Sequence, residues 1–352
     1  MKVLSKRFKY DGKPSVSLNE LQIRMKKQIE RKIEEGIYTF EDVPCCVCGG
    51  ENFELLSEKD RYGLYVPVVI CKDCGLIQTN PRMTQDAYNQ FYELEYRKLY
   101  VGKDAPADKD DFFKSEYKHG GGIYQYISEN MKRGIANALI VEIGCGAGGI
   151  LQYFKEKGND VYGVDLGSEY IEFGRDNYDL NIETGTIDNV IKGGMSPDIV
   201  IYSHTLEHIL DPVEELTKLK SICSSNTYLY IELPGVKNLT HSYEMNFLKS
   251  LQNAHTYYFT LTTLKNVLRK AGWDFVCGDD VIHTIFKPSP NKKVNYESDY
   301  EDVMTFLRRM EFYRFAPTPY NVKRLAMPIT IAFLKRTGLY NTAKKAYFKL
   351  FP

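Results

Sequence analysis

The chain of 352 residues lacks several features that would narrow its function at once. It has no excess charge, because 46 basic residues balance 46 acidic ones, and this argues against an overall field that draws it onto nucleic acid. Its longest nearly apolar run, residues 325–334, contains a proline and is too short to span a bilayer. The N-terminus carries basic residues but not the apolar stretch of a secretory signal. We therefore expect a cytoplasmic protein.

The cysteines do not follow a disulfide framework. Four of the eight form two C-x-x-C pairs, Cys45 with Cys48 and Cys71 with Cys74, and each pair is followed by glycine. One tight turn of this kind presents two thiolates, and two such turns supply the four soft ligands of a tetrahedral zinc. Cys46 is an alternative to Cys45, although Cys45 gives the usual spacing. We expect a closed, structural Zn²⁺ site within residues 44–82.

A glycine-rich turn lies in "LIVEIGCGAGGILQYF", residues 139–154. An apolar strand leads into Gly144, Gly146 and Gly148, and a helix follows, so the backbone there is able to approach a ligand closely. A dinucleotide fingerprint is formally present through Gly149. However, Glu142 precedes the turn, where an acid suits a ligand ammonium and repels a pyrophosphate. Asp165 ends the next strand, where it would accept hydrogen bonds from ribose hydroxyls.

Strands and helices alternate from about residue 123. Apolar runs at 138–144, 160–165, 198–203 and 227–234 are separated by segments of helix length, and two further strands close the unit near residue 287. This alternation predicts an α/β fold with a mostly parallel sheet covered on both faces. The segment 17–38 predicts a helix with Ser17 and Glu20 as its capping box.

Residues 204–208 match H-x-x-E-H, an inverted zinc-peptidase signature. That motif binds zinc only if one continuous helix places both histidines on the same face. Here the motif follows a buried strand, and Asp211 with Pro212 predicts the start of the next helix. We therefore interpret the peptidase match as a coincidence.

Taken together, E-x-G-x-G-x-G, Asp165, "DIVIYSHTLEHILDP", "YIELPG" and "AHTYYFTLTTLKNVLRKAGW" resemble class I S-adenosylmethionine-dependent methyltransferases over residues 123–287. With the cysteine pairs and "GLIQTNPRM…FYELEY" ahead of them, they are similar to a subgroup with an N-terminal zinc ribbon that methylates sugars and related metabolites. The resemblance implies a Rossmann-like, seven-stranded sheet with an antiparallel last strand.

The resemblance also implies the S-adenosylmethionine-binding residues. Glu142, Gly144 and Gly146 would line the methionine end, Asp165 would bind the ribose, and Ser203 would face the methionine. Thr186 and Ile187 occupy the position at which many members carry an acid that reaches adenine. The full implied set is Glu142, Gly144, Cys145, Gly146, Gly148, Asp165, Leu166, Thr186, Ile187, Ser203 and His204.

Methyl transfer often requires removal of a proton from the acceptor. His204, His208 and His255 are the candidate general bases, since the ordinary pKa of histidine lies near working pH. His255 and His208 are the better candidates of the three. For each of them a structural histidine is an equally good interpretation. Four aromatic residues of the connector resemble a segment that lies over the cofactor in relatives, or form an amphipathic helix that packs its own core: Tyr88, Phe91, Tyr92 and Tyr96.

The predicted organisation has five parts. They are an N-terminal helical segment (1–43), the zinc ribbon (44–82), a helical connector or cofactor lid (83–122), the methyltransferase domain (123–288) and a helical C-terminal extension (289–352). After Glu311 the extension has basic residues and no acid. Such a segment would form a binding surface for anionic membranes, phosphate-bearing substrates or a partner. The alternative is a helix face that is simply solvated.

Four functions remain open from the sequence. The leading hypothesis is a methyltransferase acting on a small metabolite, a sugar that is nucleotide-linked or destined for a surface polysaccharide. The others are a zinc-ribbon RNA methyltransferase, disfavoured by the balanced charge, a protein that binds S-adenosylmethionine without turnover, and, last, a metallopeptidase.

Overall fold

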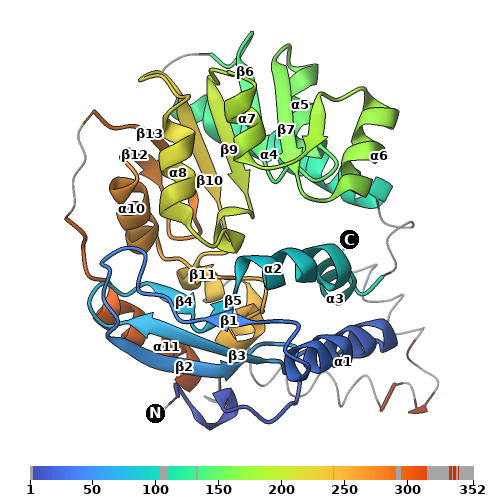
Figure 1. Ribbon diagram of the computed structural model, residues 1–352, viewed down its shortest axis with the longest axis vertical. Helices are drawn as coiled ribbons and strands as arrows, with labels where there is room; N and C mark the ends of the chain where they lie inside the picture. The colour runs from blue at the N-terminus through green and yellow to red at the C-terminus, as the bar shows by residue number, and fades with distance from the viewer. Residues whose placement is uncertain are drawn as a thin grey trace.

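A computed structural model describes residues 3–103, 109–131, 134–240, 242–290 and 295–314, together with residues 333, 334, 336, 337 and 340. A seven-stranded sheet forms its upper half (Figure 1). The strand order is β12-β13-β10-β9-β6-β7-β8, and β13 runs antiparallel to both of its neighbours while the other pairings are parallel. The strands are β6 (Leu139–Ile143), β7 (Asp160–Asp165), β8 (Ile182–Thr184), β9 (Ile199–Ser203), β10 (Tyr228–Glu232), β12 (Trp273–Gly278) and β13 (His283–Pro288). This confirms the predicted mostly parallel fold with an antiparallel last strand.

Helices cover both faces of this sheet, and each face has its own apolar core. One core contains side chains of α4 (Lys109–Asn130), α5 (Gly149–Glu156) and α6 (Ser168–Tyr178). The other contains side chains of α7 (Ile187–Lys192), α8 (Pro212–Lys220) and α10 (Leu261–Lys270). Burial on both faces explains why the central strands read as continuous apolar runs.

A second, four-stranded sheet of order β11-β4-β3-β2 lies below the first (Figure 1). Its strands are β2 (Phe53–Lys59), β3 (Tyr65–Cys71), β4 (Ile77–Thr79) and β11 (Tyr257–Tyr258). The last of these comes from the methyltransferase part of the sequence, between β10 and α10, so one strand joins the two halves. A short pair, β1 (Phe40–Glu41) with β5 (Arg82–Met83), flanks this sheet.

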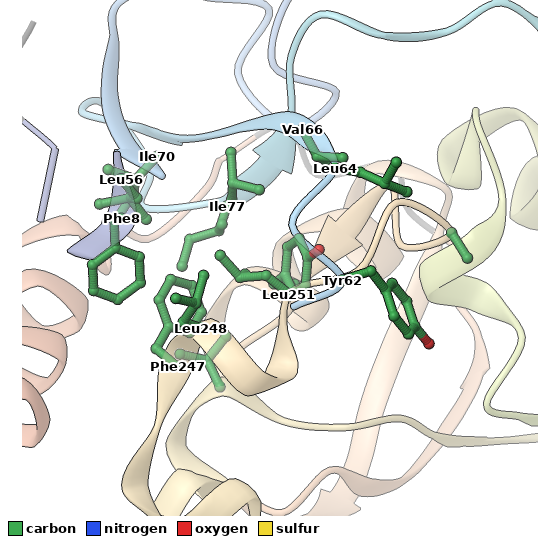
Figure 2. Close-up of a cluster of buried hydrophobic side chains, with 14 of the residues drawn as sticks. Phe8, Leu56, Tyr62, Leu64, Val66, Ile70, Ile77, Phe247, Leu248 and Leu251 are labelled. Atoms are coloured by element: carbon green, nitrogen blue, oxygen red, sulfur yellow. The ribbon is translucent and has the colours of Figure 1, made fainter. Parts of the chain in front are cut away.

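The lower sheet shares a core with the segment that follows β10. Figure 2 shows Phe247, Leu248 and Leu251 gathered with Leu56, Ile70 and Ile77 of the sheet. All six are nearly free of solvent contact. The elements around this core are 3₁₀ turns η1 (Lys6–Phe8), η5 (Val236–Thr240) and η6 (Tyr243–Met245) and helices α1 (Glu20–Glu34), α9 (Phe247–Ser250) and α11 (Tyr300–Tyr313).

The connector forms a bent run of helix between the two halves (Figure 1). It consists of α2 (Gln85–Phe91), a π-helical stretch η2 (Tyr92–Tyr96) and α3 (Arg97–Val101). The helix α4 then continues through residue 122, where the sequence suggested a change of domain. Glu95 of the π-helical stretch is fully buried and accepts hydrogen bonds from Tyr38, Gln28 and Lys32, which fix the bend against α1.

One predicted helix start is wrong. The N-cap of α1 is Asn19, and its partner in the capping box is Gln22, in place of Ser17 and Glu20. Asn19 also donates to the Gly102 carbonyl at 2.6 Å and Gln22 to the Leu99 carbonyl at 2.8 Å, so contacts with α3 select this start.

No helix among the described residues combines the length and apolar character needed to cross a membrane. Of the basic residues after Glu311, only Arg314 and Arg336 lie among the described residues.

Candidate active site

The four paired cysteines come together in space. Their sulfur atoms all lie within 4.8 Å of one another, with 3.4 Å between Cys45 and Cys74 and between Cys48 and Cys71. Sulfurs bound 2.3 Å from a tetrahedral zinc are about 3.8 Å apart, so this donor set fits the ion. Cys46 is outside the cluster.

The two turns that carry these cysteines have the same backbone. The amide of Gly49 donates to the Cys45 carbonyl, and that of Gly75 donates to the Cys71 carbonyl, both at 2.8 Å. Both glycines have φ near +80°, namely +74° and +83°, which only glycine adopts without strain. Three of the four cysteines are buried and all are free thiols, so a bound zinc would be closed off from substrate and structural.

The glycine-rich turn has the shape of a ligand cradle. Gly144, Gly146 and Gly148 all have positive φ, from +52° to +80°. A Cβ on Gly144 would overlap the Thr205 side chain, and one on Gly146 would come within 2.8 Å of the Phe112 ring. Cys145 between them is buried with its side chain in the core, so only its backbone faces the cradle.

Glu142, on the strand that leads into this cradle, has a buried carboxylate oxygen without a hydrogen-bond partner among the described residues. The side chain is 2 % exposed, and this oxygen is its Oε2. Burial, together with the nearby carboxylates of Glu116 and Asp165, raises the pKa of Glu142 well above its ordinary value. A buried acceptor of this kind fits the ammonium group of the methionine end of S-adenosylmethionine.

The residues expected around the ribose and adenine lie along the same edge. The Asp165 carboxylate accepts hydrogen bonds from the amides of Gly146 at 2.9 Å and Gly167 at 2.7 Å, which fix it at the end of β7. Leu166 beside it is 57 % exposed. Thr186 caps α7, and the side chain of Ile187 is buried in the core.

Two groups over the cradle come from the connector and were not predicted. On α4, Phe112, Glu116 and His119 follow helical spacing, so one face of the helix points toward the sheet edge. The Arg97 guanidinium lies over the rings of Phe112 at 4.8 Å and Tyr170 at 4.2 Å. No carboxylate in the described part of the chain forms an ion pair with Arg97. In the sequence Arg97 is one basic residue of a polar connector, and no pattern there distinguishes it from the others.

The H-x-x-E-H segment is not a helix with two histidines on one face. His204 follows β9 with φ of +51°, and residues Leu206–His208 form a single 3₁₀ turn, η4. Asp211 then caps α8 and accepts from the Glu214 amide at 2.9 Å, as predicted. The geometry of a zinc peptidase is therefore absent from this segment.

An outer cluster of polar side chains surrounds Glu232, the last residue of β10. His119 Nε2 is 3.0 Å and His204 Nε2 is 3.3 Å from Glu232 Oε1, and the hydroxyl of Tyr230 donates to Oε2 at 2.8 Å. Burial alone would lower the pKa of His204, but its hydrogen bond to Glu232 and the charge of Glu207 outweigh burial and raise the pKa to about 9. His204 is thus largely protonated at neutral pH when no metal or ligand intervenes.

An inner cluster of Glu207, His208 and His255 lies beside it. Their ligating atoms fall within 4.8 Å of one another, and the two imidazole rings meet edge to face at 4.8 Å between centroids. Burial lowers the pKa of His208 to about 4 and the pKa of His255 well below its ordinary value, so both rings are neutral at pH 7. Burial raises the pKa of Glu207 to about 7, and its Oε2 is unpartnered. The three histidines predicted from the sequence thus lie in one continuous network.

Hydrogen bonds fix the two neutral rings differently. His208 Nδ1 is 2.9 Å from the Ala254 carbonyl oxygen, which only accepts, so Nδ1 carries the hydrogen and Nε2 keeps its lone pair. Gln252 accepts from Arg61 through Oε1 at 2.9 Å, and its amide nitrogen therefore donates to His255 Nε2. His208 Nε2 faces Glu207 Oε1 at 3.9 Å, beyond hydrogen-bond distance, whereas the corresponding atom of His255 accepts a hydrogen bond from Gln252.

The zinc-ribbon sheet holds the segment that carries His255. Thr79 donates through its hydroxyl to the His255 carbonyl and through its amide to the Thr256 carbonyl, each at 2.9 Å. The buried Asp60 carboxylate accepts from the amides of Tyr62, Leu64 and Asn253 at 2.9–3.2 Å. The ribbon therefore helps to shape this site.

The connector aromatics cover the inner cluster. The rings of Tyr92 and Tyr96 each lie 5.8 Å from that of His208, and the Tyr88 hydroxyl donates to the Ala254 carbonyl at 2.6 Å. Phe91 is buried in the lower core. The segment packs into the lower core on one face, as one of the two sequence interpretations predicts, and borders His208 on the other.

Comparisons with known proteins bear on this arrangement. Residues 119–277 match a family described as a methyltransferase domain. A search of curated proteins found no match. Among solved structures, the plantazolicin methyltransferase BpumL with bound SAH is 17% identical, with 66% of this chain and 90% of that chain covered and a TM-score of 0.41.

Two further solved structures show similar values. A chain of the complex between the Haloferax volcanii Trm112 methyltransferase activator and a methyltransferase is 17% identical, covers 56% of this chain and 80% of that one, and has a TM-score of 0.40. The magnesium protoporphyrin IX methyltransferase of Synechocystis PCC 6803 with bound SAH is 14% identical, with coverage of 58% and 100% and a TM-score of 0.41. The family match, the sheet topology and the glycine cradle agree, and residues 119–277 are a class I S-adenosylmethionine-dependent methyltransferase domain.

Proposed function

We propose that this domain transfers a methyl group from S-adenosylmethionine to a hydroxyl group of a small metabolite, a sugar derivative that is nucleotide-linked or a precursor of a surface glycan. The acceptor would bind between the connector helices and the inner histidine cluster. The sugar class follows from the resemblance to zinc-ribbon sugar methyltransferases. It is supported by the pairing of the Arg61 guanidinium with the ring of Tyr100 at 5.3 Å, since Tyr100 is 49% exposed and offers a stacking surface beside a cation for a phosphate.

The cosubstrate supplies an electrophilic methyl group, and the chain supplies its orientation. Glu142 would bind the methionine ammonium and Arg97 the carboxylate. Among the described residues, Glu142 Oε2 is a buried acceptor without a hydrogen-bond partner and Arg97 is a guanidinium without an ion pair. Asp165 would accept from the ribose hydroxyls, and the exposed Leu166 would lie against the adenine. The backbone near Ser203 and His204 would border the methionine.

His208 is the proton acceptor in this proposal. The observation that carries it is the bond from Nδ1 to the Ala254 carbonyl, which leaves the lone pair on Nε2, with Glu207 Oε1 3.9 Å away and the connector aromatics beside the ring. The acceptor hydroxyl would lose its proton to Nε2 as its oxygen attacks the methyl carbon. His255 would orient His208 from behind, and His204 would take no proton because its Nε2 faces Glu232 Oε1 at 3.3 Å.

Substitution of His208 tests this assignment. His208→Gln keeps an amide near the Ala254 carbonyl but removes the base, so turnover should fall by about 10²–10⁴-fold while S-adenosylmethionine affinity is preserved. His255→Gln should cost less. Unchanged turnover of His208→Gln under saturating acceptor would contradict the assignment.

Methyl-labelled S-adenosylmethionine and a fractionated extract of the source cells test the acceptor class. Label should appear in nucleotide-sugar or glycan fractions, and the His208→Gln protein is the matched control. Label in RNA would overturn the sugar proposal while leaving the domain assignment intact. Cofactor binding without any transfer would support a binding protein.

A further inference from the structure

We propose that the outer cluster is a binding site for a divalent transition-metal ion, of the zinc type, held by His119, His204 and Glu232. The three ligands come from α4, from the loop after β9 and from the end of β10. Each offers one atom, and these atoms all lie within 4.8 Å of one another. The site is separate from the cysteine cluster.

The spacing of the ligand atoms fits a metal. Nitrogen and oxygen ligands 2.0–2.2 Å from a tetrahedral zinc are about 3.3–3.6 Å apart. His204 Nε2 lies 3.3 Å from Glu232 Oε1, within this range, whereas His119 Nε2 lies at the hydrogen-bond distance of 3.0 Å and would shift outward as the ion enters. A third imidazole, that of His283, points its Nε2 at the same oxygen from 3.9 Å and lies near enough to become a fourth ligand after a small shift.

The groups behind the ligands have the arrangement of a metal's outer shell. Histidine ligands usually direct their second nitrogen at a carboxylate or carbonyl, which fixes the ring and raises its basicity. Here Glu207 Oε1 is 3.9 Å from His204 Nδ1, beyond hydrogen-bond distance but in reach after a small rotation of the ring, and Asp279 Oδ2 is 3.5 Å from Nδ1 of the neighbouring His283. The Tyr230 hydroxyl fixes the Glu232 carboxylate at 2.8 Å. One imidazole would be enough to form an ion pair with Glu232, whereas three imidazoles face its Oε1.

The cluster is also open to an incoming ion. Glu232 is nearly buried, whereas the side chains of His204 and His119 are 54% and 37% exposed. Imidazole nitrogens favour zinc and its first-row neighbours over magnesium or calcium. With only His119, His204 and Glu232 bound, and His283 at its present distance, the ion retains a position for water or for an acceptor oxygen. That last role rests on the proposed function, but metal binding itself does not.

Metal stoichiometry tests the proposal without any measurement of activity. The full-length protein is equilibrated with Zn²⁺, freed of loose metal, and analysed for zinc per chain. Wild type should hold two ions, and the double variant His119→Ala/His204→Ala should hold one, in the cysteine cluster. Lys118→Ala, an exposed neighbour on α4, is the matched control and should hold two.

Chelator competition then gives the affinity of the second ion. The variant Glu232→Gln keeps the shape of the side chain but removes a ligand charge. The affinity for the second ion should fall by more than about tenfold, because disturbing only the groups that support a ligand already costs that much. Circular dichroism and thermal melts confirm that each variant is folded. One zinc in wild type, or two in the double variant, would overturn the proposal, and the latter would place the ion elsewhere, for example at Glu207, His208 and His255.

Discussion

Replacement of Arg97 by alanine should separate two parts of cosubstrate binding. The guanidinium lies over the cradle, stacked on Phe112 and Tyr170 and free of any ion pair in the described part of the chain. If it binds the methionine carboxylate, Arg97→Ala removes one charge-assisted hydrogen bond. Such bonds contribute about 1.5–3 kcal/mol, and we take the lower end because Arg97 is partly exposed. The dissociation constant should rise about tenfold.

Calorimetric titration with two ligands makes the test specific. S-Adenosylhomocysteine contains the amino-acid part, whereas 5′-methylthioadenosine contains the adenosine and sulfur without it. Arg97→Ala should weaken only the first ligand, and Lys114→Ala, an exposed lysine on α4, should weaken neither. An equal loss for both ligands would refute the reasoning, because it would show that the substitution disturbs the connector and the packing of Phe112. Glu142→Gln should give the same selective loss through the ammonium.

Two further predictions concern the glycine turn and the zinc ribbon. Gly144→Ala should abolish S-adenosylhomocysteine binding and lower the melting temperature, because the new Cβ overlaps Thr205 and the positive φ alone costs about 1–2 kcal/mol. Gly158→Ala, with φ of +81° and open space around it, should show only the backbone cost; equal losses would refute the clash. Cys71→Ser should release the zinc and speed hydrogen exchange at the Thr79 amide, which binds the Thr256 carbonyl; unchanged exchange would show that the sheet is held without the metal.

Sequence patterns were sufficient to predict those elements whose structure is determined by residues close to them in the sequence. The buried strands, the glycine turn and the paired cysteine turns are each specified within a few residues, and their positions are confirmed. The start of α1 was not, because "SLNE" and "NELQ" are both capping boxes and only contacts of Asn19 and Gln22 with α3 favour the second. Local preferences of similar strength are decided by long-range contacts of this kind.

The same reason explains which site residues were missed. His119 meets Glu232 across 113 positions of sequence, and Arg97 reaches the cradle from a connector that is polar and irregular in sequence. No period or motif marks either residue. The sequence singled out His204, His208 and His255 because they follow recognisable strands. Their different protonation states depend on burial and on Glu232, Ala254 and Gln252, which only the fold brings into contact.

In the proposed mechanism, the lower sheet would make the ribbon part of the catalytic unit. The segment that bears His255 has little regular structure of its own, so its position depends on what it contacts. Those contacts are the pairing of β11 with β4, the Asp60 carboxylate and the apolar cluster of Figure 2. Because the cysteine turns lie at the ends of the strands of that sheet, a zinc ion there would stabilise His255 and, through the Ala254 carbonyl, the tautomer of His208. A structural metal would then influence proton transfer without touching the substrate.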